Sequence, residues 1–334
     1  MAGLNWANTG KCVCNGQENS LVYGQENRRT IMSAIEINDI CKRYGKLTAL
    51  DHVSLQIGKG EMFGLIGPDG AGKSSLYRIL ATLMKPDSGT ASILGLDTVK
   101  DYKQLRRRIG YMPERFSLYP DMTVMENLNF FASLFGVRIE DNYDLIAPFF
   151  GQLERFPNRL AGKLSGGMKQ KLALSCALIH HPDILLLDEP TTGVDAVSRS
   201  EFWEMLRTLR EKEITIMVST SYMDEATLCE RIAIIDRGHI LSVGTPDALV
   251  AHLGENLYNA VAGDMFGLLS ALRKMPGVSD CYTFGAALHV VVADDFNSEE
   301  AEQSLRAQGI MDARIYPAKG NIEDLFIKLT RNDD

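Results

Sequence analysis

A glycine-rich segment at residues 67–74 has the spacing G-x-x-x-x-G-K-[ST], which suits the binding of a phosphate chain. Glycines let the backbone wrap closely around phosphate oxygens, and the helix expected to follow adds its positive end. Lys73 is expected to neutralise the β- and γ-phosphates, and Ser74 to ligate Mg²⁺. A chance glycine turn is the competing interpretation. The predicted phosphate-binding residues are Gly67, Pro68, Asp69, Gly70, Ala71, Gly72, Lys73, Ser74 and Ser75.

Two carboxylates, Asp188 and Glu189, follow the unbroken apolar run 184–187. Such a run is typical of a strand buried on both faces of a parallel sheet, and ligands of these sheets bind at the carboxyl ends of the strands. We expect Asp188 to hold the Mg²⁺ shell and Glu189 to polarise a water in line with the γ-phosphate. Strands often end in acidic residues, so the pair gains its weight from the motifs on either side.

A third motif, LSGGMKQ at residues 164–170, precedes a helical pattern, and a Gly-Val-Asp segment lies at 193–195. Together with the glycine-rich segment and the Asp-Glu pair, these motifs resemble the ATP-binding cassette (ABC) ATPases. The resemblance spans about residues 34–249, two-thirds of the chain. The sequence at 168–171 and the additional C-terminal region look most like exporter-type cassettes, which are often linked to drug efflux.

The resemblance implies that two cassettes pair head to tail, so that the LSGG segment of one closes over the ATP of the other. A serine and two glycines at the start of a helix form an anion site, which supports this reading; a plain helix cap is the alternative. Tyr44 resembles the aromatic residue that stacks on adenine, although simple packing remains possible. The residues expected to serve a partner's nucleotide are Leu164, Ser165, Gly166, Gly167, Gln170 and Asp195.

Two positions depart from the family's pattern. Glu114 stands where the family has a glutamine that touches Mg²⁺ and the attacking water. We expect Glu114 still to offer an oxygen to the metal, but with a negative charge that the glutamine lacks. Ser221 stands where a histidine normally contacts the γ-phosphate, and the chain has no histidine within ten residues of it. Losing one such contact typically costs about 10²–10³ in rate, unless Ser221 works through a water. We therefore predict a slow ATP site and favour a heterodimer with a second cassette over a homodimer.

The elements that must position these residues follow from apolar patterning. Strands are expected at 34–44, 53–57, 62–66, 184–187, 214–220, 232–236 and 239–243, with a helix at 74–83 and a mostly helical segment from 102 to about 180. From 257 on, the pattern predicts the order β-α-β-β-α-β, followed by a helix at 320–330.

The predicted fold class is therefore α/β, a P-loop NTPase cassette with a parallel-sheet core, an antiparallel β subdomain and a helical subdomain at about 115–180. The cassette is expected to cover residues 32–250, and a small ferredoxin-like α+β domain residues 255–334. Residues 1–31 are polar and lack periodicity, which indicates a disordered extension or a segment foreign to the natural protein, with Met32 as a possible start.

Composition limits the classes of partner. The chain has 334 residues, a net charge of -8 and no stretch near 18 consecutive apolar residues, so it is not expected to span a membrane or to coat nucleic acid. The six cysteines fit a reducing compartment; Cys12 and Cys14 could form half of a metal clip, but no histidine or second cysteine pair lies nearby. The resemblance implies a separate transmembrane permease and a peripheral place on the cytoplasmic face of the plasma (inner) membrane. The segment 116–134 would dock a short coupling helix of that permease.

Three functions remain open at this point. The first is the ATP-hydrolysing subunit of an exporter. The second is an ATP-gated dimerisation module with negligible hydrolysis of its own, which the residues at 114 and 221 favour. The third, a cassette ATPase acting on DNA or ribosomes, is disfavoured by the acidic balance and by the absence of an inserted coiled coil or a second cassette.

Overall fold

The computed structural model describes residues 33–210, 212–251, 253 and 256–331. The predicted extension 1–31, Met32 and the Cys12–Cys14 pair lie outside these residues. The described chain divides into two compact units. One comprises the residues up to Ser221 together with Glu230–Gly244, and the other comprises Tyr222–Cys229 together with the residues from Thr245 on.

The first unit is built on a six-stranded sheet in the order β10-β9-β3-β8-β7-β6. All neighbouring strands are parallel except the β9–β10 hairpin. The central strands are buried along their whole length, as their continuous apolar runs predict. The bounds are β3 Met62–Ile66, β6 Ile109–Met112, β7 Ile184–Asp188, β8 Thr215–Thr220, β9 Arg231–Asp236 and β10 His239–Gly244.

A second sheet of the same unit is antiparallel, in the order β2-β1-β4-β5. Its strands are β1 Ser33–Tyr44, β2 Leu47–Gly58, β4 Ser88–Ile93 and β5 Leu96–Asp97. The long pairing of β1 with β2 contains several register shifts. The inner face of this sheet joins the main core, since Ile35 and Ile57 lie in the same buried cluster as Leu65 of β3.

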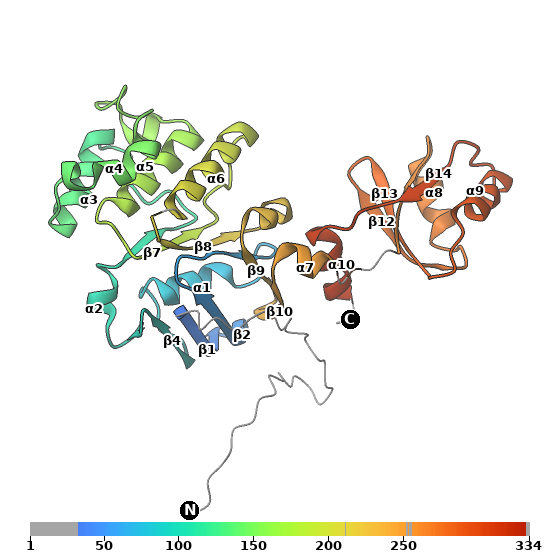
Figure 1. The fold of residues 1–334 in the computed structure, drawn as a ribbon, viewed down its shortest axis with the longest axis horizontal. Coiled ribbons are helices and arrows are strands. Elements are labelled where there is room, and N and C mark those ends of the chain that lie inside the picture. Colours follow the sequence, from blue (N-terminus) through green and yellow to red (C-terminus); the bar gives the residue numbers. More distant parts are fainter. Residues whose placement is uncertain (1–32, 211, 252, 254–255, 332–334) are drawn as a thin grey trace, which may run out of the picture. The chain divides into compact units, whose positions relative to one another are not determined.

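Helices complete the first unit, with α3, α4 and α5 gathered in one group (Figure 1). Their bounds are α1 Lys73–Leu80, α2 Tyr102–Leu105, α3 Val124–Phe135, α4 Tyr143–Phe150, α5 Gly166–Leu178 and α6 Ala196–Arg210, with 3-10 turns η1 Ile139–Asn142 and η2 Ala161–Lys163. Thr123 caps α3 in a reciprocal box with Glu126, which fixes where that helix begins. The predicted cassette architecture of parallel core, antiparallel subdomain and helical subdomain is confirmed.

The segment predicted as mostly helical contains α2, α3, α4 and α5, and it also holds the short parallel strand β6, because four residues are too few to show either period. One local prediction was wrong. The helix predicted to reach Leu83 ends at Leu80. Thr82 adopts a left-handed backbone (φ 61°), and the N–H groups of Leu83 and Met84 both bond back to the Arg78 carbonyl. Leu83 is 59% exposed as a result.

The second unit contains a four-stranded sheet in the order β12-β13-β11-β14, with every neighbouring pair antiparallel. The order of elements from residue 257 on is the predicted β-α-β-β-α-β followed by a helix. The bounds are β11 Leu257–Val261, α8 Met265–Leu272, β12 Val278–Phe284, β13 Ala287–Val292, α9 Ser298–Ala307, β14 Arg314–Pro317 and α10 Ile322–Arg331.

The boundary between the units lies earlier than the predicted 250–255. The 3-10 turn η3 (Met223–Leu228) and helix α7 (Pro246–Ala251) belong to the second unit, because both pack against α10. Within the part of the chain that the structure describes, none of the helices combines the length and apolar character needed to cross a membrane.

Candidate functional site

The glycine-rich loop leaves the buried strand β3 and enters α1, as the motif predicts. The Gly67 N–H donates to the Thr220 carbonyl oxygen at 3.2 Å, which ties the loop to the end of β8. A side chain at Gly67 would collide with the Ile235 carbonyl oxygen, and one at Gly72 with the Ala49 carbonyl oxygen. Gly72 also has φ 106°, which other residues rarely adopt. Only glycine therefore fits at these two positions.

The ammonium group of Lys73 lies within this loop. Its Nζ donates to the carbonyl oxygens of Gly67 and Pro68 at 2.6 and 2.9 Å, and it lies 2.9 Å from Glu189 Oε1. The side chains of Lys73 and Glu189 are 5% and 6% exposed, so this ion pair is almost free of water. An incoming phosphate oxygen must replace one of these three oxygens as a partner of Lys73.

A set of oxygen atoms suited to Mg²⁺ lies at the end of β7. Ser74 Oγ donates to Asp188 Oδ1 at 3.2 Å, and Ser219 Oγ donates to the same oxygen at 2.8 Å. Burial raises the pKa of Asp188, the two serine hydroxyls lower it, and the nearby charges of Glu114 and Glu189 raise it further. Burial disfavours the negative charge of this carboxylate. A hard divalent cation bound by the carboxylate and the neighbouring hydroxyl would therefore stabilise its ionised form.

Glu189 is held in a single orientation by several donors. Its Oε2 accepts from Thr192 Oγ1 at 3.1 Å and from the N–H and Oγ of Ser221 at 3.2 and 3.4 Å. Its own N–H donates to Ser219 Oγ at 2.9 Å, and its backbone is left-handed with φ 50°. Strained backbone of this kind is commonly found at functional sites. Ser221 therefore lies directly against the predicted catalytic carboxylate.

The remaining predicted residues of this group lie at its margin. Glu114 is exposed in the loop after β6, and its charge acts on Asp188. Tyr44 ends β1, is 42% exposed, and places its hydroxyl 3.3 Å from Ser75 Oγ and 3.0 Å from Met84 Sδ. The aromatic ring thus stands beside the start of α1.

The LSGG segment belongs to a different set of elements. Ser165 caps α5, accepting from the Met168 N–H at 3.4 Å, and both Ser165 and Gly166 are exposed. A side chain at Gly167 would approach Ser198 Oγ to 2.7 Å, which packs the start of α5 against the start of α6. Asp195 is exposed and accepts from the Ser198 N–H at 3.0 Å. Leu164 is buried beneath the cap, while Gln170 is partly exposed on the second turn of α5.

Sequence reasoning missed the roles of Ser219 and Thr192. Ser219 is fully buried and links the carboxylate of Asp188 to the backbone of Glu189. The available signal was a polar residue near the end of an otherwise apolar strand, and β8 pairs directly with β7 through Asp188 and Ser219.

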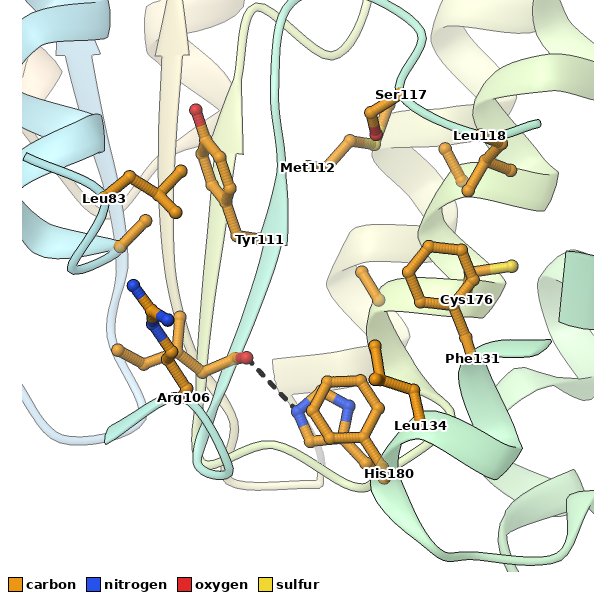
Figure 2. A pocket seen from close by; sticks show the side chains of 15 residues that line it. Leu83, Arg106, Tyr111, Met112, Ser117, Leu118, Phe131, Leu134, Cys176 and His180 are labelled. Atoms are coloured by element: carbon orange, nitrogen blue, oxygen red, sulfur yellow. Dashed lines mark hydrogen bonds between the residues drawn. The ribbon is translucent and has the colours of Figure 1, made fainter. Parts of the chain in front are cut away.

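A cavity of about 440 Å³ lies between strand β6 and helices α3 and α5. Figure 2 shows Leu83, Arg106 and Tyr111 facing Phe131, Leu134 and His180 across it. Burial lowers the pKa of His180 to about 4, so its ring is neutral at physiological pH. This ring stacks on Phe135 at 3.7 Å between centroids and bonds the Ile109 carbonyl oxygen at 3.2 Å. The cavity is therefore largely apolar and lies next to the loop that carries Glu114.

Comparison with known proteins gives consistent results. The family model described as ABC transporter matches residues 50–192. The chain is 39% identical over 303 residues to the "Probable multidrug ABC transporter ATP-binding protein YbhF" of Escherichia coli, which covers 89% of this chain and 52% of that protein. It is 36% identical over 306 residues to the Nod factor export ATP-binding protein I of Burkholderia orbicola, covering 90% of this chain and 97% of that protein. The chain thus spans about half the length of the first curated relatives it matches.

Two solved structures extend the comparison to the fold. The ATP-binding subunit of an ABC transporter is 29% identical with a TM-score of 0.60, over 66% of this chain and 93% of that one. A dimeric ATP-binding cassette in a post-hydrolysis state, bound to ADP and phosphate, is 28% identical with a TM-score of 0.57, over 63% of this chain and 98% of that one.

Proposed function

This chain belongs to the ATP-binding subunits of ABC transporters, and we propose that it hydrolyses ATP slowly to drive export through a separate transmembrane permease. The observation that carries the proposal is the convergence of Lys73, Ser74, Asp188 and Glu189 at one buried point. The name of the Burkholderia orbicola relative, a Nod factor export protein, supports export, and that of the Escherichia coli relative, a probable multidrug transporter protein, supports transport. The protein works as a peripheral subunit at the cytoplasmic face of the plasma membrane.

The chemistry follows from the contacts of Lys73 and Glu189. When a triphosphate enters the loop, Lys73 exchanges Glu189 for a phosphate oxygen, which releases the carboxylate to orient the attacking water. Ser74 and Asp188 would hold Mg²⁺, which would supply positive charge next to the phosphate chain. Thr192 and Ser221 keep the Glu189 carboxylate in place during this exchange.

ATP also joins two cassettes. The exposed cap at Ser165 and Gly166 offers backbone N–H groups and a helix start to a phosphate, and it lies on other elements than the phosphate loop. The dimeric relative bound to ADP and phosphate supports pairing of this kind. The cap therefore completes the nucleotide site of a second cassette.

The two residues that differ from the family's pattern, Glu114 and Ser221, both belong to this chain's own nucleotide site. Ser221 has no imidazole to offer the γ-phosphate, and Glu114 adds negative charge beside Asp188. A homodimer would contain two such sites, whereas a different cassette could supply one complete site. We therefore favour a heterodimer.

The cavity between β6, α3 and α5 supports coupling to the permease. Leu83 and Leu134 line this one cavity and are 59% and 64% exposed, and apolar surface that is exposed around a hollow of this kind marks protein–protein contact sites. The cavity lies beside the loop that carries Glu114. A coupling helix of the permease that docks in it would therefore be connected to the nucleotide site through that loop.

The first test is the turnover of the purified chain with Mg²⁺ and ATP. We expect a rate below about 1 s⁻¹, the low end of ordinary enzymes, and loss of that rate in Glu189→Gln. Ser221→His should raise the rate, by up to the 10²–10³ typical of one transition-state contact. Ser200→His, on the exposed surface of α6, is the matched control and should leave the rate unchanged.

A robust rate in the unmodified chain would refute the impaired site. No gain in Ser221→His would contradict the role given to residue 221. The second candidate function, an ATP-gated dimerisation module, is favoured by the same two residues. It predicts that Glu189→Gln changes no measurable turnover while ATP binding is kept.

A further inference from the structure

We propose that Cys41, Asp51 and His52, with His239 as a fourth ligand, bind a divalent transition-metal ion of the Zn²⁺ type. These residues lie in the antiparallel subdomain and at the start of β10, and none of them contributes to the phosphate contacts described above. The ligand atoms of Cys41, Asp51 and His52 all lie within 4.8 Å of one another. Thiolate, imidazole and carboxylate are the ligands that zinc takes in proteins.

The spacing of these atoms fits a tetrahedral ion. Zinc–ligand bonds of about 2.0–2.3 Å place neighbouring ligand atoms roughly 3.5 Å apart. His52 Nε2 lies 3.7 Å from Asp51 Oδ1, and His239 Nε2 lies 3.5 Å from Asp51 Oδ2. The side chain of His239 is 49% exposed, so its ring has room to turn toward the ion.

The imidazole of His52 has the partner that a metal ligand requires. Its second nitrogen, Nδ1, lies 2.7 Å from Asp39 Oδ1, which leaves Nε2 free to bind the ion on the side of Asp51, whose Oδ1 lies 3.7 Å away. Metal-binding histidines almost always donate their other N–H to a carboxylate, carbonyl or water, and this bond fixes the tautomer. The N–H of His52 also donates to Cys41 Sγ at 3.3 Å, which orients the sulfur.

The backbone brings these side chains together at a cost to local geometry. Asp39 and His52 adopt left-handed φ values of 56° and 53°, and the pairing of β1 with β2 shifts register on both sides of Ile40. Irregularities of this kind re-aim side chains and are retained at functional sites. Here they turn Asp39 and His52 toward each other on the surface of the sheet.

The test is a titration of the full-length chain with Co²⁺ and, by calorimetry, with Zn²⁺. One equivalent of Co²⁺ should bind with a thiolate-to-metal charge-transfer band, and Cys41→Ser should abolish that band. His52→Asn should weaken affinity at least tenfold, since asparagine tolerates the left-handed backbone. Asp39→Asn should weaken it about 10–100-fold through the lost support of the imidazole.

Two matched controls separate the site from general effects. His181 is also exposed and left-handed, with φ 53°, so His181→Asn should keep full affinity. Cys12→Ser with Cys14→Ser should also keep the charge-transfer band. Thermal unfolding checks that each variant folds, and His52 is 64% exposed, so its substitution leaves the core intact. Absence of stoichiometric binding, a band that survives Cys41→Ser, or a band lost with Cys12 and Cys14 would each overturn the proposal.

Discussion

At the scale of single residues, the site depends on one carboxylate, that of Asp188, which is kept in an environment that disfavours its charge. Asp188 is 1% exposed, and it has two serine hydroxyls but no cationic partner among the contacts that the structure describes for it. Glu189 shares the cation of Lys73 instead. The site is therefore poised to gain stability when a divalent cation arrives with a triphosphate, because the cation supplies the positive charge that Asp188 lacks.

This predicts that Asp188→Asn stabilises the nucleotide-free protein while ending Mg²⁺-dependent turnover. Asparagine keeps the acceptor oxygen for Ser74 and Ser219 but carries no charge, so Tm should rise by about 2–4 °C, the equivalent of roughly 1 kcal/mol. Because the folded-state pKa of Asp188 is raised, the unmodified protein should lose stability as the pH rises from the ordinary value of 3.8 through that raised pKa.

Chemical denaturation at several pH values measures this effect. The loss should be reduced in Asp188→Asn. The loss of stability with rising pH should persist in Asp195→Asn. A hydrogen bond from the Ser198 N–H lowers the pKa of Asp195, so ionisation of that carboxyl adds stability as the pH rises. An Asp188→Asn variant less stable than the unmodified protein at neutral pH would contradict this account.

At the scale of elements, the second unit depends on one buried contact that joins α10 to its sheet. Asp324 Oδ1 lies 2.6 Å from His289 Nδ1 on β13 and accepts from the Tyr282 hydroxyl on β12 at 2.9 Å. Its Oδ2 accepts from the Asn321 N–H at 2.8 Å, at the start of α10. Both members of the His289–Asp324 pair are buried, at 4% and 1% exposure. One carboxylate therefore holds a helix start and two strands.

We expect Asp324→Ala to destabilise this unit by about 3 kcal/mol, because it leaves the buried His289 and Tyr282 without their partner. Native-state hydrogen exchange at the amides of β12 and β13 measures the loss locally. Glu323→Ala, at an exposed position next in the same helix, is the matched control and should change stability by less than about 0.5 kcal/mol. Equal exchange in the two variants would show that the buried contact contributes nothing.

At the scale of the whole molecule, the proposed pairing depends on where the two nucleotide-binding segments lie. The phosphate loop and the LSGG cap lie on separate elements of the first unit, so in the pairing proposed above one chain would offer half of each of two sites. The acidic charge is also uneven, since the residues from Glu255 on carry -6 of the net -8. Like charges of that size would repel if two such regions approached each other at low salt, which weighs mildly against self-pairing.

We therefore expect Glu189→Gln, which by the proposed role of Glu189 should bind ATP without consuming it, to remain monomeric with ATP and Mg²⁺ in sedimentation velocity. Ser165→Ala in the same background is the control, because loss of the cap removes any self-pairing through LSGG. An ATP-dependent doubling of mass that Ser165→Ala abolishes would instead identify a homodimer and reject the heterodimer.

The sequence by itself determined the parts of this protein that depend on neighbouring residues. The phosphate loop, the cap at Ser165 and the pair Asp188–Glu189 are each continuous in the chain, and the roles proposed for them depend on backbone N–H groups and on the end of a strand. Local spacing therefore predicted them, together with the parallel core and the element order of the C-terminal region. The departures at Glu114 and Ser221 were also visible as residue types.

Only the tertiary structure decided the contacts between distant segments. The bond from Ser219 to Asp188 exists because β8 pairs beside β7, and that sheet order is set by packing between strands that no local pattern encodes. The same reason explains the missed strand β6, the boundary displaced by the packing of α10, and the meeting of Cys41 with His52 across an irregular pairing of β1 and β2. Periodicity reports which face of an element is buried, whereas strand order and register depend on the free energy of the whole fold.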